Sequence, residues 1–293
     1  DINNVSKPVS VIDKEDILTK SPTSVIESMK DSSGISFSRA GGLGGQLVMR
    51  GFNSNDLKIP MSINGERFRG RNTLEYNIID PSRVEKIEVI RGPAAAIYGS
   101  ESMAGMINIV TKKPKVSFDK EFTFKPIIQN MTYESVNDLR GTRIEAEGSG
   151  YGFDVQFGAS YKEANDYETP EGKALNSKFR TKSIDGSIGY SFNENSRLGF
   201  NYKISETETH RAGGLGGAPG TYAPLAQRVY MSERPIKEKY VGLTYEINPL
   251  IKGIEKIDAS VYRRSLWTDV VTTKYPNPTS VNETHRYVVG PLM

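Results

Sequence analysis

The second half of the chain alternates apolar and polar residues over segments of ten or more positions. From 151 to 162 the odd positions are Tyr, Phe, Val, Phe, Ala and Tyr, and the even ones are Gly, Asp, Gln, Gly, Ser and Lys. A period of two is typical of β-strands whose two faces meet different surroundings. Soluble strands usually run about 5 to 6 residues, whereas a tilted strand needs about 9 to 11 to cross a bilayer. The pattern therefore predicts membrane-spanning strands and disfavours a soluble antiparallel sandwich.

The same split recurs at 183–192, 197–205 and 241–247, and polar positions there include Asp185 and Lys203. Short turns alternate with long links, the turns near 148–150, 193–196 and 248–253 and the links near 164–177, 209–236 and 268–283. Tight turns on one side of a membrane and long loops on the other are typical of outer-membrane barrels. We count about eight strands after residue 115, and an eight-stranded barrel has room only for its own side chains. Because a sheet in lipid cannot leave an edge unpaired, we expect the barrel to continue beyond Met293.

Composition excludes several classes of function. No run approaches the roughly 20 apolar residues of a transmembrane helix. The net charge of +3, from 38 basic and 35 acidic residues, does not favour nucleic acid. The chain has no cysteine and two histidines, so it lacks disulfides, cysteine-ligated zinc and the usual catalytic dyads. We therefore predict that the protein is not an enzyme and needs no cofactor or resident metal.

The first 115 residues predict a compact α+β domain with a small mixed sheet, because short apolar runs alternate there with helix and turn signals. The runs expected to form strands are 9–12, 46–50, 59–63 and 84–90, and residues 15–30 read as largely helical with an interruption near Pro22. Asn64-Gly65 predicts a hairpin turn. Asp80-Pro81 has the chemistry of a helix start, and 93–98 reads as one more helical turn.

Two blocks in this half resemble the plug domain of TonB-dependent receptors. The longer block runs from Ile79 through the segment Arg83-Val84-Glu85-Lys86-Ile87-Glu88-Val89-Ile90-Arg91-Gly92-Pro93 to Lys113, and the second joins Val48–Phe52 to Ile63-Asn64-Gly65. The resemblance implies a plug at 1–115 and, at 116–293, the N-terminal portion of a 22-stranded barrel in the bacterial outer membrane. It also implies import powered through TonB, although we recognise no TonB-contacting box after Asp1.

The resemblance further implies a pair of plug arginines that lock the plug to glutamates of the barrel wall, and Arg50 and Arg91 match them. A guanidinium buried in the lumen needs a carboxylate partner, whereas one solvated by lumen water does not. We expect the partner glutamates to lie beyond Met293.

Ligand contacts are expected just after the Asn64-Gly65 turn, where the family's apical loops bind their ligand. Arg67, Arg69 and Arg71, with Tyr76 close behind, would suit a multiply negative, aromatic iron chelate through charge-assisted hydrogen bonds and cation–π contacts. A solvated basic loop is the alternative interpretation. The leading hypothesis is a receptor for a ferric siderophore whose partners are TonB, the iron chelate and outer-membrane lipid, without nucleic acid.

Other functions stay open at this point. A haem or haemoglobin receptor is the nearest rival, but the only histidines, His210 and His285, both lie outside the plug half. An adhesin or a passive pore would have no use for a plug. The heptapeptide Arg-Ala-Gly-Gly-Leu-Gly-Gly occurs at 39–45 and again at 211–217, which we interpret as loop composition rather than a phosphate cradle.

Overall fold

The structure of the 293-residue chain is a computed structural model, and the residues it describes are 9–39, 41–43, 45–53, 59–68, 77–92, 102–170, 172–174, 176–213, 229–248, 256–274 and 281–289. Among these residues no helix is long and apolar enough to span a membrane.

The N-terminal domain, called the plug below, is built on a five-stranded sheet in the order β1-β7-β8-β5-β6. These strands are β1 (Val9–Asp13), β7 (Val84–Arg91), β8 (Gly105–Thr111), β5 (Met61–Ile63) and β6 (Glu66–Phe68). Only β5 and β8 pair in parallel. A three-stranded sheet of β2 (Ile35–Arg39), β3 (Gly45–Met49) and β4 (Phe52–Asn53), helix α1 (Lys14–Lys20) and the 3-10 turns η2 (Glu27–Met29) and η4 (Pro81–Arg83) complete the domain.

Local signals account for two of these elements. Asn64 and Gly65 take positive φ values of 53° and 82° and close the predicted hairpin between β5 and β6. Asp80 accepts a hydrogen bond from the Ser82 N–H and starts a helical turn as predicted, although only a single 3-10 turn follows. The plug core gathers buried apolar side chains from both sheets and α1, and the wall residues Ile236 and Leu266 join it.

Eight long antiparallel strands follow the plug and form one sheet, called the wall below. They are β9 (Thr123–Glu134), β10 (Leu139–Gly150), β11 (Phe153–Ala164), β14 (Phe179–Asn193), β15 (Ser196–Gly213), β16 (Val229–Ile247), β17 (Ile257–Lys274) and β18 (Val281–Val289). A small hairpin of β12 (Glu168–Thr169) and β13 (Gly172–Lys173) lies in one long loop. Each wall strand pairs with its sequence neighbour, and the sheet is not closed between β9 and β18. The predicted fold class is confirmed: an α+β plug with a small mixed sheet, followed by antiparallel strands of an incomplete barrel.

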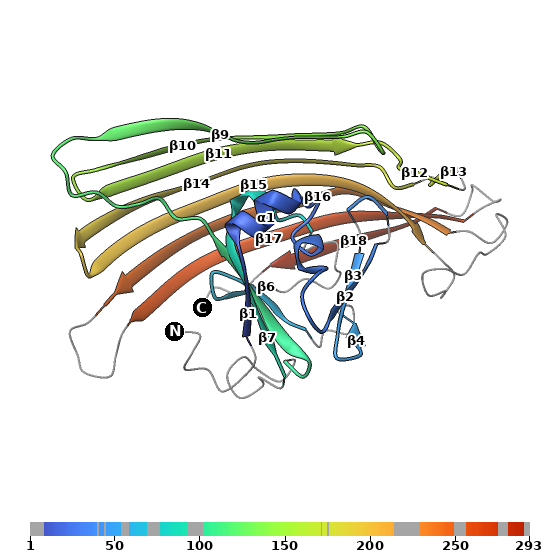
Figure 1. The fold of residues 1–293 in the computed structure, drawn as a ribbon, viewed down its shortest axis with the longest axis horizontal. Coiled ribbons are helices and arrows are strands. Elements are labelled where there is room, and N and C mark those ends of the chain that lie inside the picture. Colours follow the sequence, from blue (N-terminus) through green and yellow to red (C-terminus); the bar gives the residue numbers. More distant parts are fainter. Residues whose placement is uncertain are drawn as a thin grey trace.

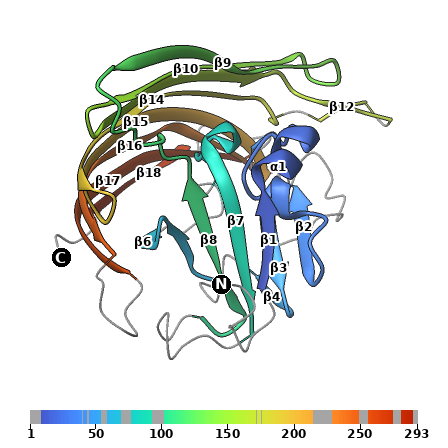
Figure 2. The same cartoon turned by 60° about the vertical axis from the view of Figure 1, so that its left-hand side comes forward.

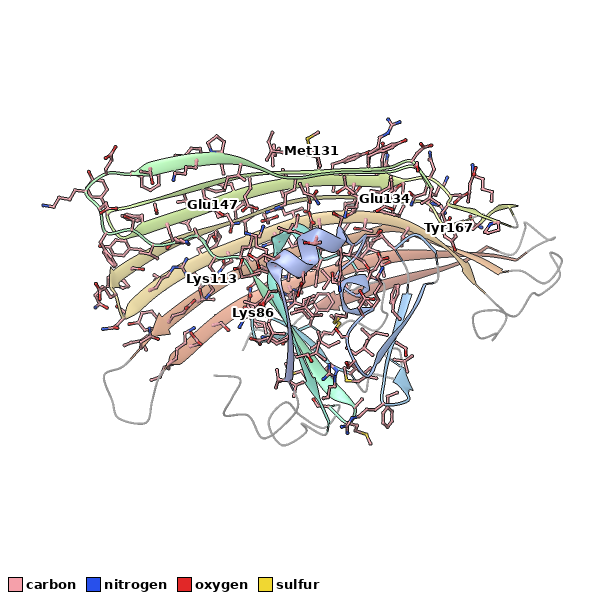
Figure 3. All side chains as sticks on the ribbon, viewed as in Figure 1. Lys86, Lys113, Met131, Glu134, Glu147 and Tyr167 are labelled. Atoms are coloured by element: carbon pink, nitrogen blue, oxygen red, sulfur yellow. The ribbon has the colours of Figure 1, made fainter. Side chains whose placement is uncertain are left out.

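The two faces of the wall differ as the alternation predicted. On the outer face Met131 is 78% exposed and Ile184 57%, whereas on the inner face Asp154 and Asp185 are at most 1% exposed. Figure 3 shows Met131 on the side of the sheet away from the plug. The wall curves around the plug, which lies on its concave side (Figures 1 and 2).

Some predicted boundaries were wrong. β15, β16 and β17 contain 18, 19 and 18 residues, so the long links expected at 209–236 and 268–283 shorten to 214–228 and 275–280. The extra length of β15 is polar on both faces, so hydropathy did not mark it. Tyr151, predicted to begin a strand, lies in a turn with a φ of 54°. Residues 93–98 lie outside the described part of the chain.

Candidate functional site

Six charged side chains lie on the inner face of the wall, in two neighbouring rows that run across the strands where the plug contacts the wall. Strand pairing places four of them in one row with Gly158 and Tyr240, in the order Glu145, Gly158, Asp185, Lys203, Tyr240, Arg264. Arg143 and Glu238 lie in the adjacent row. Together the six residues of the two rows are called the charged row below. They are Arg143, Glu145, Asp185, Lys203, Glu238 and Arg264. None is more than 9% exposed, and three cations balance three anions. Buried charges persist only when they are paired, so this row is an organised network.

Asp185 lies at the centre of the tightest part of this network. Arg143 donates to both of its carboxylate oxygens at 2.9 Å and to Glu145 at 2.9 Å. Gly158 makes room for this guanidinium, because a Cβ there would lie 2.1 Å from Nη2. Arg83 of the plug then pairs with Asp185, with 3.0 Å between Nε and Oδ2. A plug cation thus meets a carboxylate that the wall already orients.

Asp80 lies in the plug beside this contact. Its Oδ1 accepts hydrogen bonds from the Ser82 N–H at 2.9 Å and from the Ser82 hydroxyl at 2.7 Å. Burial alone would raise the pKa of Asp80, but Lys162, the Ser82 hydrogen bonds and Arg143 outweigh it and lower the pKa to about 2. A space of about 20 Å³ remains between plug and wall here, enough for a single water. The packing is therefore close to dry.

The other end of the charged row meets strand β6. Tyr240 donates to Glu66 at 2.7 Å, and Arg264 lies 3.7 Å from the same carboxylate. The Arg264 guanidinium also stacks near three aromatic rings, at 5.0 Å from Phe68 of the plug, 4.8 Å from Tyr240 and 5.8 Å from Tyr262. Burial raises the pKa of Glu66, while the Tyr240 hydrogen bond and the Arg264 charge oppose that rise.

A cavity of about 520 Å³ lies between the plug and strands β15–β17, next to the contact of Glu66 with Tyr240. Polar and charged side chains dominate its lining, including Lys86, Glu88 and Lys203. At its edge Lys113 pairs with Glu246 near the short turns of the wall. Lys86 and Lys113, labelled in Figure 3, belong to the plug side of this space. Arg83 also lines this cavity, so its contact with Asp185 lies at the border of the space beside β5 and β6.

The glycine-rich segment 39–45 has a definite contact at the loop end of the wall. A Cβ on Gly42 would lie 2.0 Å from the backbone oxygen of Ser177, so only glycine allows this approach. Leu43 packs beside it with Leu139, Ala164 and Phe179. This copy therefore packs the plug against the wall, and the interpretation of the repeat as loop composition stays a prediction. Of the second copy, 214–217 lies outside the described residues.

The predicted lock arginines lie away from these contacts. Arg50 is exposed with a φ of 51°, and its guanidinium lies near Gly92. Arg91, at the far end of β7 from η4, donates to the Ser10 hydroxyl at 2.7 Å. Within the described part of the chain neither forms an ion pair with a wall carboxylate, so their role as a lock stays a prediction.

The predicted ligand residues are only partly described. Arg67 is half-buried in β6, next to Glu66 and Phe68, which contact the wall. Arg69, Arg71 and Tyr76 lie outside the described residues.

Sequence reasoning missed the contact that the structure makes most prominent. Arg83, Arg143 and Asp185 were not predicted as site residues. A usable signal existed, since a charged residue on the polar face of a buried strand requires a partner. Identifying that partner required the strand register and the position of the plug.

Comparisons with known proteins agree with this arrangement. The profile of the TonB-dependent receptor plug domain matches residues 1–106. The ferrichrome outer membrane transporter/phage receptor of Escherichia coli K12 is 32% identical over 126 residues, which are 42% of this chain and 17% of that protein. The vitamin B12 transporter BtuB of Vibrio vulnificus is 28% identical over 188 residues, 63% of this chain and 30% of that protein.

Solved structures share the fold at low sequence identity. The copper transporter OprC has a TM-score of 0.75 at 20% identity over 96% of this chain and 42% of its own. The siderophore receptor PiuA of Acinetobacter baumannii has a TM-score of 0.63 at 20% identity over 91% of this chain and 37% of its own. This chain spans less than a third of the length of the curated relatives named above. It belongs to the TonB-dependent receptors of the bacterial outer membrane and comprises their plug domain with part of the barrel.

Proposed function

We propose that the complete receptor imports a ferric siderophore across the outer membrane, with energy supplied through TonB. The observation that supports this most is the contact of Arg83 with Asp185, which holds the plug on the inner face of the barrel wall. A plug fixed by buried charge blocks the lumen and has to be moved against that attraction. A passive pore or an adhesin has no need for such a device.

The substrate proposal is supported by charge and by relatives. Arg67, Arg69 and Arg71 bring three cations to one short segment, which suits an anionic chelate. Relatives include the ferrichrome transporter and the ferric enterobactin receptor PirA of Pseudomonas aeruginosa, 35% identical over 124 residues. The vitamin B12 transporters among the relatives make cobalamin the alternative to compare.

The position of His210 does not support haem. Thr209 faces inward with 1% exposure, and alternation along β15 places His210 on the outer face, away from the lumen. It cannot ligate a haem held inside the barrel from there.

The test uses the full-length receptor. Intrinsic fluorescence quenching compares ferric catecholate, ferric hydroxamate, haem and cobalamin, and uptake of the tightest ligand is then measured in cells with and without TonB. We expect tight binding of a ferric siderophore and TonB-dependent uptake. Tighter binding of cobalamin or haem, or uptake that persists without TonB, would overturn the proposal.

A further inference from the structure

We propose that the outer face of the wall binds an anionic membrane lipid, whose phosphate groups contact Lys237, Lys239 and Arg263 on strands β16 and β17. These three residues are called the lipid patch below. The patch lies on the convex face of the wall, away from the plug (Figures 1 and 2). The proposal therefore does not depend on which substrate the receptor imports.

The three cations of the lipid patch are accessible from outside the wall. Lys239 and Arg263 are exposed, and half of the Lys237 side chain is exposed. Their strand neighbours Glu238 and Arg264 are at most 9% exposed and belong to the charged row on the inner face. Because successive side chains of a strand point to opposite faces, the patch points away from the plug.

Strand pairing brings the three cations close together. Lys237 lies opposite Trp267 and Lys239 opposite Ser265. Arg263 precedes Ser265 by two residues on the same face, so Lys239 and Arg263 are diagonal neighbours across two strands. Such neighbours lie about 7–8 Å apart, within reach of long side chains. One headgroup with phosphate groups can therefore contact the whole patch.

The wall does not neutralise the charge of the lipid patch. Among the residues that the structure describes, Lys239 and Arg263 form no ion pair. Lys237 lies 4.0 Å from Glu206, a carboxylate that Lys182 approaches to 3.0 Å. The patch therefore has an excess of positive charge, and an anion from outside the protein can form charge-assisted hydrogen bonds with it.

The lipid patch begins where the apolar part of the outer face ends. On β16, Leu243 and Val241 are about half exposed, and Lys239 is the next outward residue towards the long loops. On β17, Val261 is 52% exposed and Arg263 is the next outward residue in the same direction. Long loops of outer-membrane barrels lie on the extracellular side. The patch is therefore level with the headgroups of the outer leaflet.

The neighbouring side chains suit a lipid better than a soluble anion. Nζ of Lys237 lies 5.5 Å from the ring centre of Trp267, the only tryptophan of this chain, and tryptophan is enriched at membrane–water interfaces. Acyl chains can lie along Val241 and Val261 while the phosphate groups contact the patch. Clusters of basic residues beside a membrane-spanning segment recognise anionic headgroups in this way.

The test compares two double variants of the full-length receptor that remove the same kinds of charge. Lys239→Gln/Arg263→Gln removes the two unpaired cations of the lipid patch. Arg180→Gln/Lys182→Gln is the matched control, because these cations of the same face each lie 3.0 Å from a carboxylate of β15. Both variants change only exposed side chains, so both are expected to assemble.

Native mass spectrometry of the receptor in detergent measures the binding of added lipid A, a diphosphorylated glycolipid, and of the same lipid after its phosphates are removed. We expect the dissociation constant for lipid A to rise about tenfold or more in the patch variant and by less than about twofold in the control. Removal of the phosphates should weaken binding to the wild type but not to the patch variant.

Equal weakening in both variants would show that overall charge, not the lipid patch, attracts the lipid. Unchanged binding in the patch variant, or equally tight binding of the dephosphorylated lipid to the wild type, would also overturn the proposal. Displacement of lipid A by inorganic phosphate would assign the patch to a soluble anion instead. Because these measurements need neither siderophore nor TonB, a failed uptake experiment would leave them unaffected.

Discussion

Arg83 of the plug and Asp185 of β14 form an ion pair of 3.0 Å on the inner face of the barrel wall, and the carboxylate is oriented in advance by Arg143. Two guanidinium groups from different domains therefore depend on one buried aspartate. This contact ties the stability of the plug position to a residue of the wall.

Removing that charge should be costly. Asp185→Asn leaves Arg83 and Arg143 with one anion fewer in a buried site, so we expect a loss of about 3–5 kcal/mol in the free energy of unfolding. Urea denaturation of the full-length receptor in detergent, followed by circular dichroism, measures the loss. Glu208→Gln removes an exposed ion pair of the same length and should cost only about 0–1 kcal/mol. Equal midpoints for the two variants would contradict the prediction.

Asp80 should make plug stability sensitive to acid. Its folded pKa of about 2 lies below the ordinary value of 3.8, so its contribution is complete above pH 3.8 and is lost as pH falls towards 2. The shift corresponds to about 2 kcal/mol. Melting temperatures between pH 5 and pH 2 should fall more steeply for the wild type than for Asp80→Asn. Parallel curves would show that Asp80 is not involved.

Lys112 should make stability depend on pH in the alkaline range, because its buried ammonium group is unfavourable in the folded state. Burial lowers its pKa from 10.5 to about 8, so the unfolded chain binds this proton more tightly than the folded one. Stability should therefore rise as pH increases from 8 to 10.5, and below pH 8 the buried ammonium is a constant cost. Lys112→Met is expected to raise the melting temperature at pH 7 and to remove this rise. Lys112→Arg, which stays charged over this range, should also remove the rise but should not raise the melting temperature at pH 7.

Gly158 should tolerate no side chain. A Cβ there would lie 2.1 Å from Nη2 of Arg143, whose guanidinium is held by Asp185 and Glu145. We expect Gly158→Ala to cost about 1–3 kcal/mol. Gly141→Ala on β10 is the matched control, because its Cβ would meet only the flexible Lys162 side chain at 3.3 Å. Urea midpoints that are the same for both variants would refute the role given to Gly158.

The three arginines after the β5–β6 turn should determine affinity for an anionic ligand. Replacing Arg67, Arg69 and Arg71 together with Gln is expected to weaken binding of a ferric siderophore by about tenfold or more, because charge-assisted hydrogen bonds are lost. Fluorescence quenching of the full-length receptor measures the dissociation constant. Arg180→Gln on the outer face should leave it unchanged, and unaltered affinity in the triple variant would remove these arginines from the site.

Several features could be predicted from sequence because their causes are local. The alternation from Phe153 to Tyr161 predicted an outer and an inner face for β11, and the structure has Phe153 and Phe157 exposed and Asp154 buried. The Asn64-Gly65 turn and the Asp80 cap were also correct, since each depends on the conformational preference or side chain of the residue itself. The ends of β15, β16 and β17 were missed, because residues 209–213, 229–236 and 268–274 do not alternate regularly between apolar and polar side chains.

The sequence by itself determined the two-domain plan, the inward and outward faces of the strands and the family. Only the tertiary structure decided which charges meet. Arg83, Arg143 and Asp185 are far apart along the chain, and their contact depends on strand register and on how the plug sits against the wall. A charged residue on the inner face of a predicted strand indicates that a partner of opposite charge is needed. Because electrostatic attraction acts through space, only the folded geometry decides which residue that partner is.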